Sequence, residues 1–165
     1  MADRRAVNLT FQLTGDNFPH AWFFNRFRVD KIGDSFLITF GLATEAGGIL
    51  AVNGIVLGQA DMEHNRQRAM DYLSKVSDSH DKSCLMAFTA PPARVYPVNH
   101  MNLARVDKIA EIGFFRFSVN SLADKIRELD SKPESKTAPL LCYPVVMFRC
   151  DLAVQLAFVK ALYSV

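Results

Sequence analysis

A short stretch of this 165-residue sequence alternates aromatic rings with arginines. It runs from Trp22 to Arg28 and reads WFFNRFR. In a strand, alternate residues share a face, and one such face would carry Trp22, Phe24, Arg26 and Arg28. Exposed rings beside cations hold single-stranded nucleic acids, because every base can stack on them. Alternatively, one face packs in the core and the arginines lie at the solvated end of a sheet.

Five residues of this basic region occur a second time. The sequence RVDKI fills Arg28–Ile32 and, 77 positions later, Arg105–Ile109. Core packing explains the retained valine and isoleucine, but not the retained charges. These either form cross-strand ion pairs in related strands or remain from a duplication. With the second copy included, the candidate nucleic-acid or partner face comprises Trp22, Phe24, Arg26, Arg28, Lys31, Arg105 and Lys108.

The four histidines and three cysteines do not have the spacing of a known catalytic or metal site. His80 and Cys84 are four residues apart, but no second pair accompanies them, whereas zinc takes about four converging ligands. A Cys84–His100 nucleophile pair is chemically conceivable. Gly47-Gly48 lacks the lysine and helix that follow in a phosphate-binding loop. We therefore predict a protein that is not an enzyme and has no metal site or cofactor.

Composition narrows the classes of partner and the compartment. The net charge is +2, with 22% charged and 50% hydrophobic residues. So small a charge disfavours nucleic-acid binding by bulk electrostatics alone, although a local basic face can coexist with it. No apolar segment approaches the roughly 20 residues of a membrane helix, and no apolar stretch follows the positively charged start. These features predict a cytoplasmic protein that is not membrane-bound.

The repeated pentapeptide belongs to a longer pattern that predicts the fold. Offsets of 77 and then 90 pair Asn25 with Asn102, Phe40 with Phe117, Ile55–Leu57 with Val145–Met147, and Asp61 with Asp151. We expect an α+β fold in which an antiparallel four-stranded unit with a C-terminal helix occurs twice about a pseudo-two-fold axis. The units are 1–79 and 80–165, fused into one domain.

Hydrophobic periodicity and turn residues locate the expected elements. In the first unit these are strands at 7–14, 21–32, 36–41 and 47–57, then a helix at 62–76 capped by Asp61. Gly33-Asp34 is expected to form a hairpin turn. In the second unit they are strands at 84–89, 101–109, 114–120 and 140–148, an inserted short helix near 121–130, and a final helix.

The final helix, expected at 151–163, is apolar almost all round and therefore needs burial on every side. One sheet can cover only one side of it. We expect the other side to contact a second copy or another protein, through Val154, Phe158 and Leu162.

Two resemblances add to this interpretation. Phe24-Asn25, Arg28-Val29, the run 36–41, and 55–57 before a helix ending near Tyr72-Leu73 resemble a family of short bacterial proteins of unknown function. That resemblance covers about the first half of the chain, which departs from the family in carrying a second copy. The duplicated plan also resembles, in topology, the Whirly and Pur-alpha binders of single-stranded nucleic acid. Neither resemblance includes a signature motif, so it assigns no functional residue.

The leading hypothesis is a non-catalytic binding or assembly module that acts as a homodimer or with a protein partner. The alternative is a single-stranded DNA or RNA binding protein that uses the basic and aromatic face.

Overall fold

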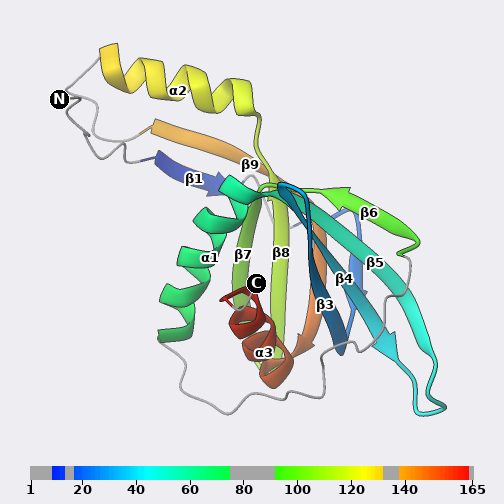
Figure 1. Ribbon diagram of the computed structural model, residues 1–165. Coiled ribbons are helices and arrows are strands. Elements are labelled where there is room, and N and C mark those ends of the chain that lie inside the picture. The colour runs from blue at the N-terminus through cyan, green and yellow to red at the C-terminus, as the bar shows by residue number, and fades with distance from the viewer. Residues whose placement is uncertain (1–8, 14–16, 75–91, 132–137, 164–165) are drawn as a thin grey trace.

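Two mixed sheets and three helices make up the described part of the chain, residues 9–13, 17–74, 92–131 and 138–163 of the computed structural model (Figure 1). The strands are β1 (Leu9–Leu13), β2 (Ala21–Phe23), β3 (Arg26–Ile32), β4 (Ser35–Ala43), β5 (Ile49–Gly58), β6 (Arg94–Pro97), β7 (His100–Val106), β8 (Ile109–Arg116) and β9 (Ala138–Asp151). The helices are α1 (Gln59–Ser74), α2 (Val119–Ser131) and α3 (Leu152–Tyr163). The α+β class expected from the sequence is confirmed.

The two halves of the chain exchange strands. One sheet has the order β3-β4-β5-β6, and the other has the order β1-β9-β8-β7, with β2 also pairing with β9. Neighbours within β3-β4-β5 and β7-β8-β9 are antiparallel. In contrast, β2 runs parallel to β9, and β6 runs parallel to β5. Each hairpin is therefore preceded by a strand that joins the other half's sheet.

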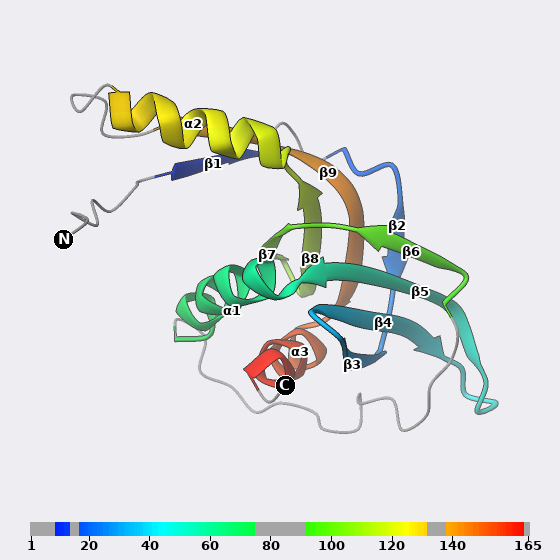
Figure 2. The same ribbon diagram turned by 45° about the horizontal axis from the view of Figure 1, so that its top comes forward.

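The helices cross between the halves in the same way. Helix α1 follows β5 and contacts β7, while α3 follows β9 and contacts β3. The two helices also contact each other (Figures 1 and 2). One buried cluster contains residues from both sheets and both helices. The two halves consequently share a single core.

Aromatic rings join the two sheets at the centre of that core. Phe40 of β4 stacks on Phe148 of β9, with ring centroids 4.0 Å apart. Phe158 of α3 lies 5.6 Å from Phe40 and 5.5 Å from Phe27 of β3. All four rings are fully buried. Because burying one such side chain stabilises the fold by about 1.5–3 kcal/mol, this cluster is a main source of cohesion between the halves.

The two hairpins match in their backbone conformation. The β3–β4 and β7–β8 loops each have two residues, beginning at Gly33 with φ 60° and at Asp107 with φ 56°. A positive φ at this position suits the strand twist and favours glycine or a short polar residue. The ladder then shifts register just after Phe40 in β4 and just after Phe114 in β8. Both features recur 74 residues apart.

An asparagine next to each bulge closes the corresponding strand. The Asn25 side chain accepts a hydrogen bond from the Ala43 N–H (2.7 Å) and donates one to the Ala43 carbonyl (3.3 Å). Asn99 does the same with Phe117, at 2.9 and 2.8 Å. These pairs are also 74 residues apart. Each amide therefore bridges the start of one strand and the end of the next.

The offsets of 77 and 90 do not superimpose these features. Arg28–Ile32 lies within β3, whereas Asp107 and Lys108 of the second copy form the β7–β8 turn. Asn25 corresponds by its hydrogen bonds to Asn99, not to Asn102. The identical pentapeptides thus occupy positions that differ by three residues. Exposed polar identities did not reveal this shift, because packing and hydrogen bonding fix the positions.

Other expected elements need correction as well. The segment 21–32 is not one strand, since Phe24 and Asn25 separate β2 from β3 and these strands belong to different sheets. Asp61 is the third residue of α1 rather than its cap, and its carboxylate bonds back to the Gly58 backbone. Strands β4, β5 and β9, the Gly33-Asp34 turn, and helices α2 and α3 lie close to their expected positions. The strand expected at 84–89 falls outside the described residues.

We predict that the buried asparagine bridge contributes more to stability than the half-buried one. Asn99→Ala leaves two buried backbone groups of Phe117 without their partner and should lower the free energy of unfolding by about 2–3 kcal/mol. Asn25→Ala should cost about 1–2 kcal/mol, because water can reach the freed groups. Urea titration of both variants measures the difference.

Asn102→Ala is the matched control. Asn102 is the residue that the sequence offset pairs with Asn25, and its loss should change stability by less than about 0.5 kcal/mol. A cost for Asn102→Ala as large as that for Asn99→Ala would contradict this account.

Candidate functional site

The aromatic residues of the sequence-predicted face lie against the core. Phe24 is buried, with its ring 4.9 Å from Phe40. Trp22 is half-buried in β2 and packs against the same cluster. Strand alternation was the wrong basis for grouping these rings with the arginines, because the chain changes sheets between them. Phe24 does not offer an exposed stacking surface.

The arginines of β3 are engaged locally. The Nε of Arg28 donates to both carboxylate oxygens of Asp30, at 2.9 and 3.0 Å. Arg26 donates from Nη1 to the carbonyl of Asn25 at 2.9 Å. The ion pair within RVDKI therefore forms along one strand, and not between the two copies.

The remaining predicted cations are exposed but lie in separate places. Lys31 lies near the β3–β4 turn, where the Asp34 carbonyl accepts a hydrogen bond from the first residue of α1. Arg105 ends β7, and Lys108 lies in the β7–β8 turn, whose Ile109 pairs with the residue before α3. The two groups belong to different sheets and lie beside the starts of different helices. The structure does not gather them on one face.

The predicted partner surface on α3 is covered by its own chain. Val154, Phe158 and Leu162 are all buried. Helix α3 contacts α1, β3, β8 and β9, so the exchanged arrangement of the halves covers sides that a single sheet would leave open. These three residues are not available to a second copy or another protein.

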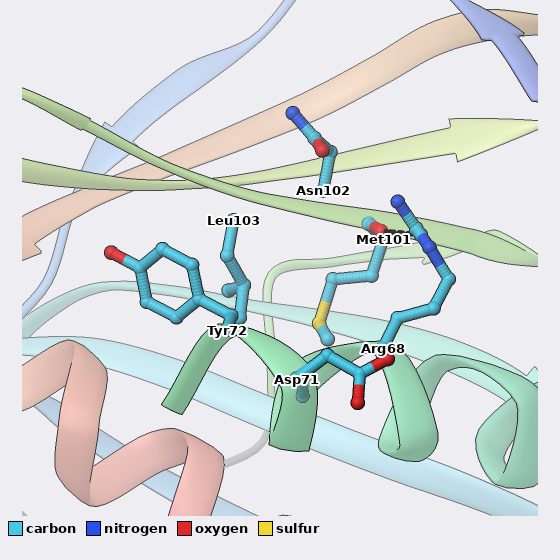
Figure 3. A pocket seen from close by; sticks show the side chains of 7 residues that line it. Arg68, Asp71, Tyr72, Met101, Asn102 and Leu103 are labelled. Carbon is cyan, nitrogen blue, oxygen red and sulfur yellow. Dashed lines mark hydrogen bonds between the residues drawn. The ribbon is translucent and has the colours of Figure 1, made fainter. Parts of the chain in front are cut away.

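A different group of residues surrounds a pocket between α1 and β7 (Figure 3). Its volume is about 250 Å³. One wall comes from successive turns of α1 and the other from the edge strand of the larger sheet. The lining residues are Arg68, Ala69, Asp71, Tyr72, Met101, Asn102 and Leu103.

Side chains of α1 bind the outward backbone groups of β7 at this pocket. The Met101 N–H donates to Asn65 Oδ1 at 2.9 Å, and the Met101 carbonyl accepts from Arg68 Nη1. The same Nη1 also bonds the ring of His100, with 3.1 Å to Nε2. An edge strand otherwise presents unpaired backbone groups. Helix α1 therefore protects this edge and fixes the position of Arg68.

Burial and the arginine charge keep the neighbouring histidines neutral. Burial first, then the charges of Arg68 and His64, lower the pKa of His100 to about 3. Burial and Arg68 also lower the pKa of His64, whose ring lies 6.2 Å from that of His100. At neutral pH the positive charge of this group is carried by Arg68. No carboxylate among the described residues forms an ion pair with it.

The thiol closest in electrostatic terms is not in a reactive form. Burial raises the pKa of Cys142 to about 11, and the positive charge of Arg68 only partly opposes this. A protonated thiol is a poor nucleophile. Cys84, the thiol that the sequence pairs with His100, lies outside the described residues. Within the described segments, no three histidine, cysteine, aspartate or glutamate side chains gather as metal ligands.

Sequence reasoning missed this site because Arg68 looks like a solvated helix residue. It follows Glu63 and Arg66 in a polar segment, and the helical period alone places it away from the apolar stripe. The signal available was the spacing of His64 and Arg68, four residues apart and hence on one helix face. Only the tertiary pairing of α1 with β7 brings them to His100.

Comparisons of the chain with protein-family models, with curated proteins and with solved structures found no match. None of the helices in the described ranges is both long and apolar enough to cross a membrane.

We predict that His100 makes folding stability depend on pH below neutrality. Its pKa is lower in the folded state, about 3, than the usual 6.5, so the unfolded chain binds a proton that the folded chain does not. Stability is therefore full above pH 6.5 and falls with decreasing pH, by up to about 1.4 kcal/mol per unit. His100→Asn should remove this component of the slope.

Urea unfolding at a series of pH values measures the difference between the two proteins. His20→Asn leaves the Arg68 group unchanged and should retain the wild-type slope. The raised pKa of Asp61 acts equally in all three proteins and cancels in the comparison. Parallel curves for wild type and His100→Asn would show that His100 does not titrate in this way.

Proposed function

We propose that this chain is a non-catalytic binding or assembly module formed by duplication of a unit with four strands and a helix. One unit would comprise β2 to β5 and α1, and the other β6 to β9 and α3, with α2 inserted between β8 and β9. The matched turns, bulges and asparagine bridges, each 74 residues apart, support this origin. So does the reciprocal exchange of β2 and β6, which fits a pseudo-two-fold axis between the units.

Binding is proposed to involve the parts that lie outside the duplicated plan. Strand β1, residues 138–143 of β9 and helix α2 form a projection that we call the arm (Figures 1 and 2). One face of the arm packs in a small cluster of its own with Leu122 of α2. On β9, Leu141 is 44% exposed and Tyr143 is 56% exposed. They alternate with Cys142, which belongs to that cluster, so they lie on the opposite face.

A second copy of the chain is the partner that best fits this face. A two-stranded ribbon is marginally stable in water unless other elements pack against it, and α2 covers only one side. An isologous contact brings the Leu141 and Tyr143 side chains of two copies together. The buried thiols of Cys142 and Cys150 suit a reducing compartment, and we propose that the dimer acts in the cytoplasm.

We expect the wild-type protein to be a dimer at micromolar concentration, as measured by native mass spectrometry and light scattering. The double variant Leu141→Glu, Tyr143→Glu should weaken the dimer at least about tenfold, because it places like charges in a desolvated contact. Leu50→Glu is the control, since Leu50 is 58% exposed in β5 and outside the arm. A monomeric wild-type protein, or a double variant of unchanged affinity, would contradict the proposal.

Single-stranded nucleic acid is the second candidate. One observation favours it: Lys31 and Arg105, again 74 residues apart, are exposed cations on the edge strands β3 and β7. A backbone could follow both edges without requiring the buried rings. This candidate needs phosphate contacts from both strands.

Titration of a short labelled oligonucleotide at several salt concentrations tests that candidate. The double variant Lys31→Ala, Arg105→Ala should reduce the slope of log affinity against log salt by about 1.4, from two lost phosphate contacts. Arg94→Ala removes an exposed charge from β6 and should have a smaller effect. Absence of binding by the wild-type protein at low salt would eliminate this function.

A further inference from the structure

Arg68 retains hydrogen-bond donors that face the α1–β7 pocket. A guanidinium has five donors, and Nη1 is engaged by His100 and the Met101 carbonyl. Nε and Nη2 make no hydrogen bond with any residue that the structure describes. They are also not among the buried polar atoms that lack a partner, so they are open to solvent. These atoms form the planar fork that matches a carboxylate.

The backbone of β7 offers a further polar group beside this fork. In an antiparallel pair, alternate residues direct both N–H and C=O toward the partner strand or away from it. Both groups of Met101 bond side chains of α1, so they point away from β8. Leu103, two residues further along, directs its N–H and C=O the same way, toward the pocket that it lines.

The pocket's size and lining limit the ligand to a small molecule with an apolar body. Its volume of about 250 Å³ corresponds to roughly eight water molecules at about 30 Å³ each. Besides the polar groups, its walls include Ala69, the thioether of Met101 and the ring of Tyr72. The hydroxyl of Tyr72 is bonded to Gln155 Oε1 at 2.8 Å, which fixes that ring.

Asp71 determines which anion the pocket favours. It lies on α1 at the rim, three residues from Arg68, and is exposed. A single negative charge on the ligand balances Arg68, whereas a second would be repelled by the Asp71 carboxylate. The local charge therefore favours a monocarboxylate over a phosphate dianion.

We propose that the pocket between α1 and β7 is a binding site for a small monocarboxylate. The carboxylate is held by Nε and Nη2 of Arg68, with the N–H of Leu103 as a further donor, and the apolar body lies against Ala69, Met101 and Tyr72. This site is separate from the arm, so its occupancy does not depend on dimerisation or nucleic-acid binding.

Calorimetric titration of the full-length protein with sodium benzoate and sodium butyrate tests the proposal. Arg68→Met should weaken binding of both at least about tenfold, since one charge-assisted fork is lost. Asp71→Asn replaces an exposed side chain without disturbing the packing and should tighten binding about threefold. Arg94→Met removes the same charge from another sheet and should leave the affinity unchanged.

Two comparison compounds separate the ligand classes. Benzyl alcohol should bind at least about tenfold more weakly than benzoate, because it lacks the charge. Inorganic phosphate should also bind more weakly, and preference for phosphate would overturn the assigned class. Absence of carboxylate binding, or an affinity that neither Arg68→Met nor Asp71→Asn changes, would overturn the site itself. Should Arg68→Met fail to fold, the direction of the Asp71→Asn change decides the question.

Discussion

The fold depends on the reciprocal exchange of elements between the two halves. Strand β2 completes the sheet of β9, β6 completes the sheet of β5, and each long helix that ends a half contacts the edge strand of the other. Neither half can therefore bury its own apolar faces alone. The stacked rings of Phe40 and Phe148 lie where both contributions meet. Surface features such as the arm and the pocket are attached to this shared core.

The same exchange explains the burial of α3. A helix that follows a sheet usually hides one stripe, but α3 lies among β3, β8, β9 and α1. Gln155 is fully buried there. Its side chain donates to the carbonyls of Ala104 and Glu111 and accepts from the hydroxyl of Tyr72. A buried amide with all these partners costs little and holds α3, α1 and the larger sheet in one arrangement.

Much of the fold can be predicted from local patterns, whereas the site cannot. Alternation and turn residues locate β4, β5 and β9, and the helical spacing of Leu122 and Ile126 locates α2. The repeat was detectable, but matching Arg28 with Arg105 misplaced it by three residues. The hydrogen-bonding partners of Asn25 and Asn99 identify the true correspondence. Nothing local in Arg68 or His100 indicates that they meet, because their contact arises from pairing between the halves.

Divergence between the two helices gives the pocket a physical origin. Helices α1 and α3 begin 93 residues apart, so Asn65 corresponds to Phe158 and Ala69 to Leu162. On α3 these positions carry large side chains, and the Phe158 ring packs 5.5 Å from that of Phe27. On α1 they carry an amide and a methyl group. The smaller residues leave space against β7, and Arg68, which corresponds to Ala161, adds a cation beside it. A groove that α3 fills with apolar side chains is thus a charged pocket at α1.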